Sequence, residues 1–429
     1  MILELNRIKL SSIIVILFPA TLISGPLIPE ILSFTLSIYL FIYLIKEKSI
    51  LILKDKIFLF LILYYIYLLI ISLFLIPIEN IFKDQFFYFR FIIFSYAIYL
   101  ILSENRDLLD KICFFFIILF TFLIIDVLIQ FFYGKNLLGF VSSTPNRYSG
   151  IFGEELVLGS YLSRFFPLII GLIYINKKLK FNNLIILFFS AFVCLAVFIS
   201  GERTALGLTF LTILFLFLKK DFRKISIYIL IFAVLSLSIL SYFNKSQRYR
   251  IFVEPLHQMS LLDDEFLKKY SDVATDYSPD NLKNFHIFSS HHHSHIMTGI
   301  NIFKDNFIIG VGPEQFREKC KDIKYASGSD PCSTHPHNIL IQILSETGLI
   351  GFIFYLVTIF YLFINIFNKI NLKRYNDHKD LEYFILITFI INLWPLLPSG
   401  NFFNNWLSFI IFFPLGFYIY TKNLKYGNK

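Results

Sequence analysis

The sequence is short of charged residues, and this shortage excludes an ordinary soluble protein. Only 16% of its 429 residues are charged, whereas 56% are hydrophobic and the mean hydropathy is +0.68. A soluble chain is roughly a quarter charged and near half apolar. The composition therefore indicates a membrane protein, and we expect a lipid bilayer as its environment. The net charge of +9 would also suit nucleic acid, but cytoplasmic loops of membrane proteins collect Lys and Arg, so no nucleic acid is expected.

Cysteine is also scarce, with four residues in the whole chain. Cys113 and Cys194 lie inside apolar runs and are expected to be inert packing residues. Cys320 and Cys332 lie in the one long polar segment and could pair in an oxidising compartment. The first apolar run lacks a small-residue cleavage site and leads into a second run, so no cleavable signal peptide is expected.

Long apolar runs fill most of the chain. A helix needs about 17–25 apolar residues to cross a bilayer, and no alternating barrel pattern is visible. The sequence predicts an all-α integral membrane protein with about twelve transmembrane helices, at residues 8–24, 27–45, 57–77, 86–102, 112–133, 155–175, 181–199, 204–218, 225–242, 339–366, 383–398 and 402–420.

The loop charges predict the orientation. With the N-terminus inside, the inner segments hold 22 Lys and Arg residues and the short outer loops hold four, which are Lys83, Lys135, Arg147 and Arg203. This bias predicts that both termini are cytoplasmic. The chain then divides into helices 1–9 over residues 1–242, an outer loop over 243–337, and helices 10–12 with a cytoplasmic tail over 338–429.

The outer loop is predicted to be partly helical. Its Ser-, Asp-, Asn- and Pro-rich middle, 270–284, is expected to be irregular. Apolar residues at helical spacing follow, so 296–306 is predicted as a short amphipathic helix. The sequence FIIGVGP after it predicts a glycine-rich turn.

The sequence HPHN at 335–338 joins this loop to an apolar run. Pro336 suits the first turn of a helix and Asn338 can cap it, which places His337 at the mouth of a membrane helix. A histidine there can act as a general base, since its pKa lies near working pH. The alternative, favoured on the local pattern alone, is a histidine that only caps the helix.

A second polar sequence, SGERTALG at 200–207, joins two apolar runs on the same outer face. Arg203 begins the second run, where an arginine is costly unless paired, hydrated or functional, and its guanidinium matches phosphate. The alternative is an arginine that reaches the surface and pairs with Glu202. Arg248 and Arg250, with Lys245, follow a membrane helix on the outer side, where they suit either an anionic ligand or a solvated loop.

Two further groups have open roles. The tract HHHSH at 291–295 invites a metal site, but adjacent histidines seldom converge on one ion and no CxxC or HExxH accompanies them. Asp126 and Gln130 share one face of an apolar helix, and ionisable residues inside membranes are functional candidates. The alternative for Asp126 is a structural pair with an intramembrane arginine, such as Arg90 or Arg164.

Together these motifs resemble the O-antigen ligase and O-antigen polymerase superfamily, bacterial multi-spanning enzymes of surface polysaccharide assembly. The segments SGERTALG and HPHN…ETGLIG, which ends at Gly351, are similar to two signature segments of the family. NIFKDNFIIGVG at 301–312 looks like a third, with Phe307 in place of proline. Features around Asp126 and Arg147 look like upstream parts of the family pattern. The resemblance is strongest over residues 120–355.

The resemblance implies a glycosyltransferase of the bacterial inner membrane with its active site facing the periplasm. The donor would be a glycan on undecaprenyl pyrophosphate, and the acceptor lipid A-core or a growing glycan. His337 matches the catalytic histidine, and Arg203 the first pyrophosphate-binding arginine. Asn338, Glu202, Glu346, Asp126 and Arg147 would support them. No metal or cofactor is implied.

One departure concerns the second phosphate-binding arginine of the family, whose position falls near His292. A protonated His292 could replace it, or Arg248, Arg250 or Arg317 could take its place. Cys320 and Cys332 bracket an excursion just before His335, and we predict a disulfide that anchors the catalytic turn, worth roughly 3 kcal/mol in the chain-entropy model.

Several functions remain open. We favour ligation to lipid A-core, while polymerisation and protein O-glycosylation share the same motifs. A flippase or transporter of lipid-linked sugars usually shows two similar halves, and none is visible here. A pure scaffold is the weakest alternative.

Overall fold

The computed structural model describes residues 9–47, 54–82, 85–105, 107–144, 146–259, 261–262, 264–273, 286–370 and 377–423. Most of the predicted irregular stretch at 270–284 lies outside these ranges, as do several loop lysines and arginines used in the charge count. Within them every named element is a helix, and the one β-type contact is an isolated bridge between Lys135 and Val141. The expected all-α class agrees with this.

Twelve helices among the described residues each overlap one of the predicted apolar runs. They are α2 (Leu10–Thr21), α3 (Leu27–Glu47), α4 (Lys56–Leu75), α6 (Phe89–Glu104), α7 (Leu108–Tyr133), α8 (Leu158–Ile175), α9 (Asn182–Ile199), α10 (Arg203–Leu218), α11 (Arg223–Phe243), α17 (Ile339–Ile370), α18 (Asp377–Asn392) and α19 (Asn405–Asn423). Short elements flank them: α5 (Ile78–Ile81), η2 (Phe86–Tyr88), η3 (Gly150–Phe152) and η4 (Lys220–Phe222).

By length and composition, eight segments among the described residues can cross a membrane: α3, α4, Ile78–Glu104, α7, α8, α9, Lys220–Phe243 and α17. These make the chain a multi-pass membrane protein. The spans predicted at α2, α10, α18 and α19 stay predictions, as does the orientation.

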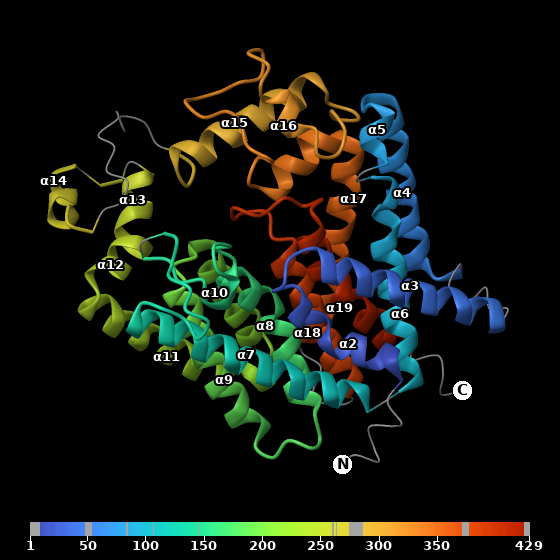
Figure 1. Ribbon diagram of the computed structural model, residues 1–429, viewed down its shortest axis with the longest axis horizontal. Helices are drawn as coiled ribbons and strands as arrows, with labels where there is room; N and C mark the ends of the chain where they lie inside the picture. Colours follow the sequence, from blue (N-terminus) through green and yellow to red (C-terminus); the bar gives the residue numbers. More distant parts are fainter. Residues whose placement is uncertain are drawn as a thin grey trace.

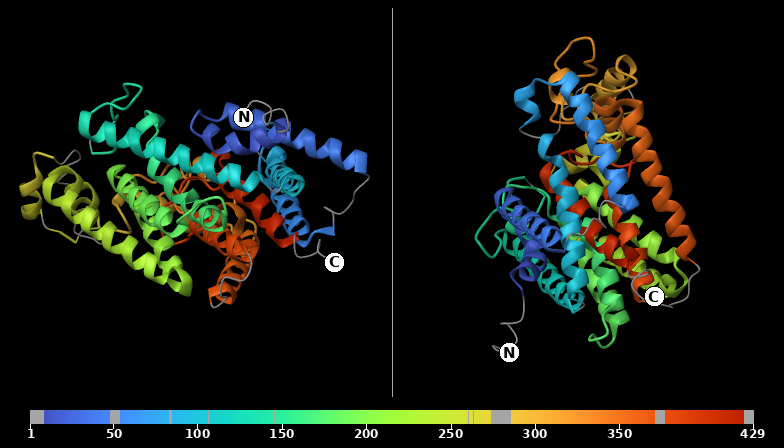
Figure 2. Two further views of the ribbon diagram at one scale, coloured as in Figure 1. Left: turned by 90° about the horizontal axis from the view of Figure 1, so that it is seen from below. Right: turned by 90° about the vertical axis from the view of Figure 1, so that its right-hand side faces the viewer.

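The helices surround a central pair, α8 and α18. Every residue of α8 from Tyr161 to Tyr174 is buried, and so are the apolar residues of α18; a helix that is apolar on all sides belongs in the middle of a bundle. The two helices touch closely at Gly171, where a Cβ would lie 2.6 Å from Phe384. Around them α6 packs on α19, and α4 runs beside α17 (Figures 1 and 2).

The described part of the long polar segment, residues 243–337, lies at the left and the top of the molecule in Figure 1, and we name it the cap. Its first part contains α12 (Lys245–Arg248), the π-helical turn η5 (Tyr249–Val253) and α13 (Glu254–Gln258), followed by α14 (Asp264–Leu267) and η6 (Lys268–Tyr270). Its second part contains α15 (Ser290–Asp305) and α16 (Phe316–Lys319). The predicted amphipathic helix is therefore present, but it begins at Ser290 and includes the histidine tract.

The predicted single run at 339–366 is wrong in one respect, because α17 is broken at Gly348. That residue has φ 62° and ψ −165°, which is not helical. Glycine tolerates such a backbone because it has no Cβ. The break divides α17 into a short polar-lined helix next to the cap and a long apolar helix.

Candidate active site

His337 lies just before α17, in an unusual backbone conformation. The helix begins at Ile339, and the Asn338 side chain accepts a hydrogen bond from Ile341 N (3.1 Å), as expected for a cap. Pro336 lies before the helix and not in its first turn. His337 has φ 54°, a region that non-glycine residues seldom occupy. Ser399 N donates to His337 O (2.8 Å), which ties this turn to the loop between α18 and α19.

Four imidazole rings gather here, and we name them the histidine cluster: His292, His295, His335 and His337. The ring centroid of His337 lies 4.2 Å from that of His335, 5.2 Å from that of His295 and 5.4 Å from that of His292. His337 Nε2 also lies 3.0 Å from Ser333 Oγ, and His335 Nε2 lies 3.0 Å from Ser399 O. The cap segment and α17 thus bring together histidines that are 45 residues apart in sequence (337 − 292).

Burial keeps these rings neutral. Burial first, and next the neighbouring histidines, lower the pKa of His337 and of His292 to about 4 and that of His335 to about 3. The Asp330 carboxylate opposes this by raising the pKa of His337. At neutral pH His337 is therefore an unprotonated imidazole, which can accept a proton.

His295 is a member of the cluster that the motif comparison did not single out. It is 5% exposed, and neither ring nitrogen has a hydrogen-bond partner among the described residues. Asp330 Oδ2 lies 3.7 Å from His295 Nε2 and 2.9 Å from His291 Nδ1. The spacing of His292 and His295, three residues apart on one helix, was the available signal that they share a face.

A second group, which we name the arginine cluster, consists of Arg147, Arg203 and Arg250. Arg203 Nη1 donates to Gln258 Oε1 (2.9 Å), and its Nη2 lies 3.7 Å from Glu254 Oε1. Arg250 Nη1 binds both carboxylate oxygens of Glu254, at 2.6 and 2.9 Å. Glu254 is four residues after Arg250, so an i,i+4 ion pair could have been predicted from the sequence.

Arg147 completes the arginine cluster from the loop between α7 and α8. Its Nε is buried without a hydrogen-bond partner among the described residues, while Nη2 donates to Leu156 O (3.3 Å). Burial, and next the charge of Arg250, lower the pKa of Arg147. The loop that carries Arg147 can pack closely against Gly201 because this residue has no Cβ. Gly201 has φ 69°, and a Cβ there would lie 2.6 Å from Asn146 O. Three guanidinium groups therefore crowd one turn.

Glu202 does not pair with Arg203, contrary to the alternative considered from the sequence. Its carboxylate accepts hydrogen bonds from Gly159 N (2.6 Å) and Ser160 N (3.0 Å) at the start of α8. A carboxylate is favourable there because the first N–H groups of a helix lack partners inside the helix. Glu202 thus holds the turn before α10 on α8 and leaves Arg203 to the cap.

His292 links the two clusters. After burial, the positive charges that lower its pKa include His337, His295 and Arg203. His292 Nδ1 lies 2.7 Å from Ser289 Oγ, which also caps α15. Of the residues predicted to bind pyrophosphate, the structure brings Arg203, Arg250 and His292 together.

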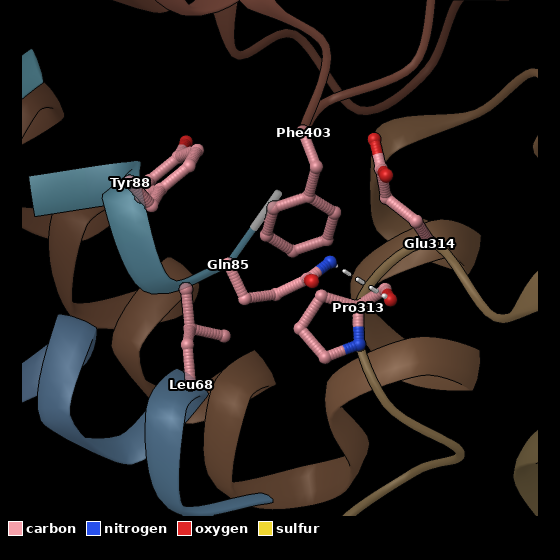
Figure 3. Close-up of a pocket in the computed structure, with 6 residues that line it drawn as sticks. All are labelled: Leu68, Gln85, Tyr88, Pro313, Glu314 and Phe403. Carbon is pink, nitrogen blue, oxygen red and sulfur yellow. Dashed lines mark hydrogen bonds between the residues drawn. The ribbon is translucent and has the colours of Figure 1, made fainter. Parts of the chain in front are cut away.

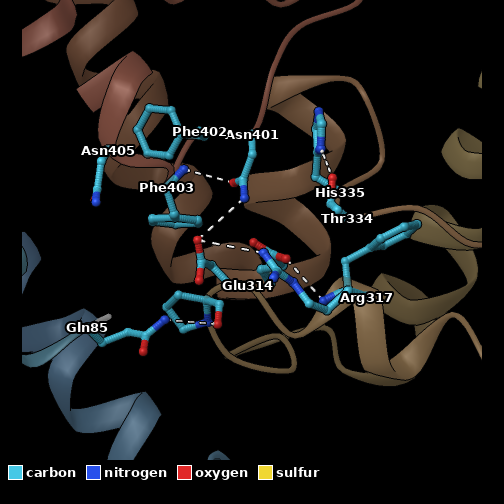
Figure 4. Close-up of polar contacts among 12 residues, drawn as sticks. Gln85, Glu314, Arg317, Thr334, His335, Asn401, Phe402, Phe403 and Asn405 are labelled. Carbon is cyan, nitrogen blue, oxygen red and sulfur yellow. Dashed lines mark hydrogen bonds and ion pairs between the residues drawn. The ribbon is translucent and has the colours of Figure 1, made fainter. Parts of the chain in front are cut away.

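The other two predicted phosphate ligands lie elsewhere. The Arg248 guanidinium stacks over the Tyr270 ring at 5.6 Å, and Lys245 pairs with Asp272 (2.6 Å). Arg317 lies near enough to His335 to lower its pKa, with Nη2 3.9 Å from Glu314 Oε1 (Figure 4).

Glu346 lies beneath the cap and holds it on α17. Its Oε1 accepts from Phe316 N (3.1 Å) and its Oε2 from Gln342 Nε2 (3.0 Å). Gln342 Nε2 also reaches Asn401 Oδ1 (2.7 Å), and Asn401 Nδ2 reaches Glu314 Oε1 (3.4 Å; Figure 4). Glu346 therefore supports the site from below, through the loop before α19.

A pocket opens beside this network, between α4, η2 and the turn at Pro313. It is lined by Leu68, Gln85, Tyr88, Pro313, Glu314 and Phe403 (Figure 3). Gln85 Nε2 donates to Pro313 O (3.3 Å) across it. One carboxylate and two aromatic rings thus line this pocket.

Asp126 and Gln130 organise the loop that carries Arg147. Asp126 Oδ1 accepts from Leu137 N (2.9 Å), and Gln130 Oε1 accepts from Gly150 N (2.8 Å). The alternative of an internal Asp–Arg pair is wrong within the described residues. Arg90 pairs with Glu30 (3.0 Å), and Arg164 donates to Asn392 Oδ1 (3.1 Å).

The structure joins Cys320 and Cys332 in a disulfide with a Cα–Cα distance of 5.1 Å. Its loop precedes Ser333, which contacts His337. Among the described residues, no group of three or more His, Cys, Asp or Glu side chains is arranged to hold a metal ion.

One family model matches the chain, that of the O-antigen ligases, over residues 185–356. The matched region runs from α9 into α17 and includes Arg203, Arg250, His292 and His337. A comparison with curated proteins finds no match. The matched segment carries both signature motifs, the whole histidine cluster, and the arginine cluster except Arg147. The match over residues 185–356 supports membership of the O-antigen ligase superfamily.

Proposed function

We propose that the protein transfers a glycan from a polyprenyl pyrophosphate to lipid A-core on the periplasmic face of the inner membrane. The observation that carries the proposal is a neutral histidine cluster near an arginine cluster whose charges are incompletely paired, close enough for Arg203 to lower the pKa of His292. The family match supports the proposal, because the O-antigen ligase family implies lipid-linked glycan and acceptor substrates.

The arginine cluster suits the leaving group. Pyrophosphate gains negative charge as its bond to the anomeric carbon breaks, and preorganised donors stabilise that charge most in the transition state. Arg203 has one direct hydrogen bond and an ion pair of 3.7 Å, and Arg147 keeps an unpartnered Nε. These groups gain partners when an anion arrives, whereas a fully paired cluster would have to break contacts first.

His337 suits the acceptor. Its neutral ring takes the proton of the acceptor hydroxyl as the oxygen attacks the anomeric carbon, so that one C–O bond forms while the bond to pyrophosphate breaks. An approaching pyrophosphate raises the pKa of His337 from its low value, since negative charge favours the protonated ring. The base thus becomes stronger when the donor is present.

His292 lies between the two groups and replaces the second arginine of the family. A neutral imidazole donates one hydrogen bond to a phosphate oxygen, and it gains a charge if the donor raises its pKa. Arg250 supplies permanent charge at the same place. The second cation is therefore shared, in this proposal, between Arg250 and His292.

The test is complementation of a strain that lacks the gene, followed by gel analysis of lipopolysaccharide. Loss of all glycan from the core, with polymer kept on its lipid carrier, supports ligation. Core with a single repeat unit would indicate a polymerase, and normal lipopolysaccharide with an altered glycoprotein would indicate protein glycosylation.

The same strain tests the base. His337→Ala is expected to reduce transfer by about 10²–10⁴-fold, the usual share of a general base. His291→Ala is the matched control, because His291 belongs to the same tract but its side chain is 67% exposed. Transfer that is unchanged in a well-expressed His337→Ala protein would remove His337 from the mechanism.

A further inference from the structure

We propose that residues 306–312, between α15 and α16, form a hairpin that re-enters the membrane. Its tip, Phe307, Ile308 and Ile309, would lie in the hydrocarbon of the bilayer beside α4. This differs from the sequence prediction, which placed all of 243–337 outside the membrane. The proposal requires that α4 and α17 span a membrane, and it does not depend on the glycan reaction.

The hairpin replaces backbone hydrogen bonds that α17 loses at Gly348. Val311 N donates to Ser345 O (3.1 Å) and Gly312 N donates to Glu346 O (2.8 Å). On the other side of the break, Leu349 N donates to Phe307 O (2.8 Å) and Ile350 N to Ile308 O (3.3 Å). Broken helices are tolerated at membrane depth where neighbouring protein satisfies the freed groups.

The two backbones touch so closely that only glycine fits at the contact. A Cβ on Gly310 would lie 2.4 Å from the carbonyl carbon of Glu346, and a Cβ on Gly348 would lie 2.4 Å from Ile308 O. Gly310 N also donates to Asn306 O (2.9 Å), which closes the turn around the tip. The hairpin is thus a built part of α17.

The contacts with α4 indicate the depth of the hairpin. Gly312 lies against Ile76, just beyond the end of α4, whereas Thr347 O accepts a hydrogen bond from Tyr67 (2.5 Å). Tyr67 is eight residues before Leu75, or about 12 Å along the helix at 1.5 Å per residue. The partners of the tip, Leu349 and Ile350, follow Thr347 further down α17. The tip therefore points away from the cap, along the span.

The side chains of the tip face outward. Phe307, Ile308 and Ile309 are 50%, 62% and 36% exposed, and on α4 at this end Leu73 and Phe74 are 57% and 81% exposed. Exposed apolar side chains at this level are favourable in hydrocarbon and costly in water. Ile323 provides the contrast. It is 92% exposed, but it lies on the disulfide loop between Lys321 and Lys324.

The hairpin also links the membrane to the site. α15 carries His292 and His295 near its start and the hairpin at its end, so fixing the tip in the bilayer fixes how far α15 stands above it. In this arrangement the depth of the histidine cluster is set by the membrane contact.

The test uses single cysteines that carry an environment-sensitive fluorophore. The native cysteines are the Cys320–Cys332 disulfide and two buried residues, so an added thiol is the accessible one. Ile308→Cys is compared with Phe74→Cys, on the lipid face of α4, and with Ile323→Cys. Labelled protein is reconstituted in phosphatidylcholine vesicles with and without bromine on the acyl chains.

The bromolipid is expected to quench the label at Ile308→Cys at least half as strongly as at Phe74→Cys, and to leave Ile323→Cys unquenched. Quenching of Ile308→Cys no greater than that of Ile323→Cys would overturn the proposal. So would concentration-dependent cross-linking between Ile308→Cys copies, which would show that a second chain covers the tip. Ile309→Cys repeats the measurement if Ile308→Cys does not fold.

Discussion

The molecule has two groups of buried charges, and the two are paired differently. Where α10, α17, α18 and α19 meet, Lys219 pairs with Asp380 (2.5 Å), and Glu382 binds Lys369 (2.8 Å) and Lys422 (2.9 Å). Each lysine has its own carboxylate oxygen. We name this group the lysine cluster.

The arginine cluster has the same ratio of cations to carboxylates, with three arginines beside Glu202 and Glu254. Its arginines, however, are incompletely paired. Glu202 is used on the backbone of α8, Arg250 takes both oxygens of Glu254, and Arg203 stands 3.7 Å from that carboxylate. Charges that only hold helices together are expected to be fully paired, since an unpaired buried charge is costly. Charges that await an anion keep donors available, at the expense of stability.

Breaking the lysine cluster should have the largest effect on stability. Lys219→Met leaves Asp380, which is 3% exposed, without its cation, and removal of one partner of a buried pair costs about 3–5 kcal/mol. Thermal unfolding in detergent measures the loss. Transfer per folded molecule should stay near that of the wild type.

The double variant Lys219→Met/Asp380→Leu is the control. An apolar pair of similar volume is often neutral relative to a buried ion pair, so most of the stability should return. A double variant as unstable as Lys219→Met would mean that packing, and not the unpaired carboxylate, causes the loss.

Breaking the arginine cluster should have the opposite pattern. Arg203→Ala is expected to lower the transfer rate by about 10²–10³-fold, the usual effect of removing one donor to a developing charge. Stability should change little, because Glu254 keeps Arg250. Arg203→Lys should restore only part of the rate, since an ammonium cannot form the planar fork.

Rates with purified donor and acceptor, measured beside the melting temperature, separate the two patterns. Arg248→Ala is the matched control, because Arg248 lies on the same cap but stacks on Tyr270. Equal losses of rate in Arg203→Ala and Arg248→Ala would place the anion elsewhere on the cap.

Much of the helix layout could be predicted from the sequence, because long apolar runs can satisfy their backbone in lipid only as helices. The break at Gly348 could not, since it depends on a hairpin some forty residues earlier that supplies the missing hydrogen bonds. The start of α15 was also missed. The histidine tract has no clear apolar periodicity, and its contacts with His337 come from a distant part of the sequence.

The site could be predicted where a motif marks it, and missed where contacts come from distant loops. His337, Arg203 and Asn338 stand in motifs that are recognisable in one sequence. Ser399 and Asn401 reach the site from the loop before α19, and nothing in their local sequence indicates this. Glu202 is the opposite case. Its place beside Arg203 in the sequence suggested an ion pair, but its carboxylate accepts hydrogen bonds from backbone N–H groups at the start of α8.

The disulfide tests whether the cap depends on its own cross-link. Cys320→Ser/Cys332→Ser removes a closed loop of about a dozen residues, which is worth roughly 3 kcal/mol at most in the chain-entropy model. We expect lower resistance to proteolysis around 317–332 and a modest fall in transfer. Mass tagging of thiols in protein from native membranes gives the direct measurement, and two free thiols there would contradict the pairing.

The smallest expected effect is a displacement of the pH profile. It tests whether an anion bound at the arginine cluster changes the pKa of His337. Burial lowers the pKa of His337 to about 4, so the free enzyme should keep its base unprotonated well below the pKa of about 6.5 of an ordinary histidine. Activity is then present at neutral pH and is lost as pH falls through the lowered pKa.

The donor should shift the acid limb of the pH profile, where activity is lost, to higher pH. Its pyrophosphate stabilises the protonated ring of His337. The pH dependence of kcat/KM reports the free enzyme and that of kcat reports the complex. We therefore expect the acid limb of kcat at a higher pH than that of kcat/KM, by about one unit if the anion contributes about 1.4 kcal/mol. In Arg203→Lys, which keeps the charge but loosens the phosphate, the separation should shrink. If the two acid limbs coincide in the wild type, the anion binds too far from His337 to change its pKa. The arginine cluster and His337 would then not act on the same substrate.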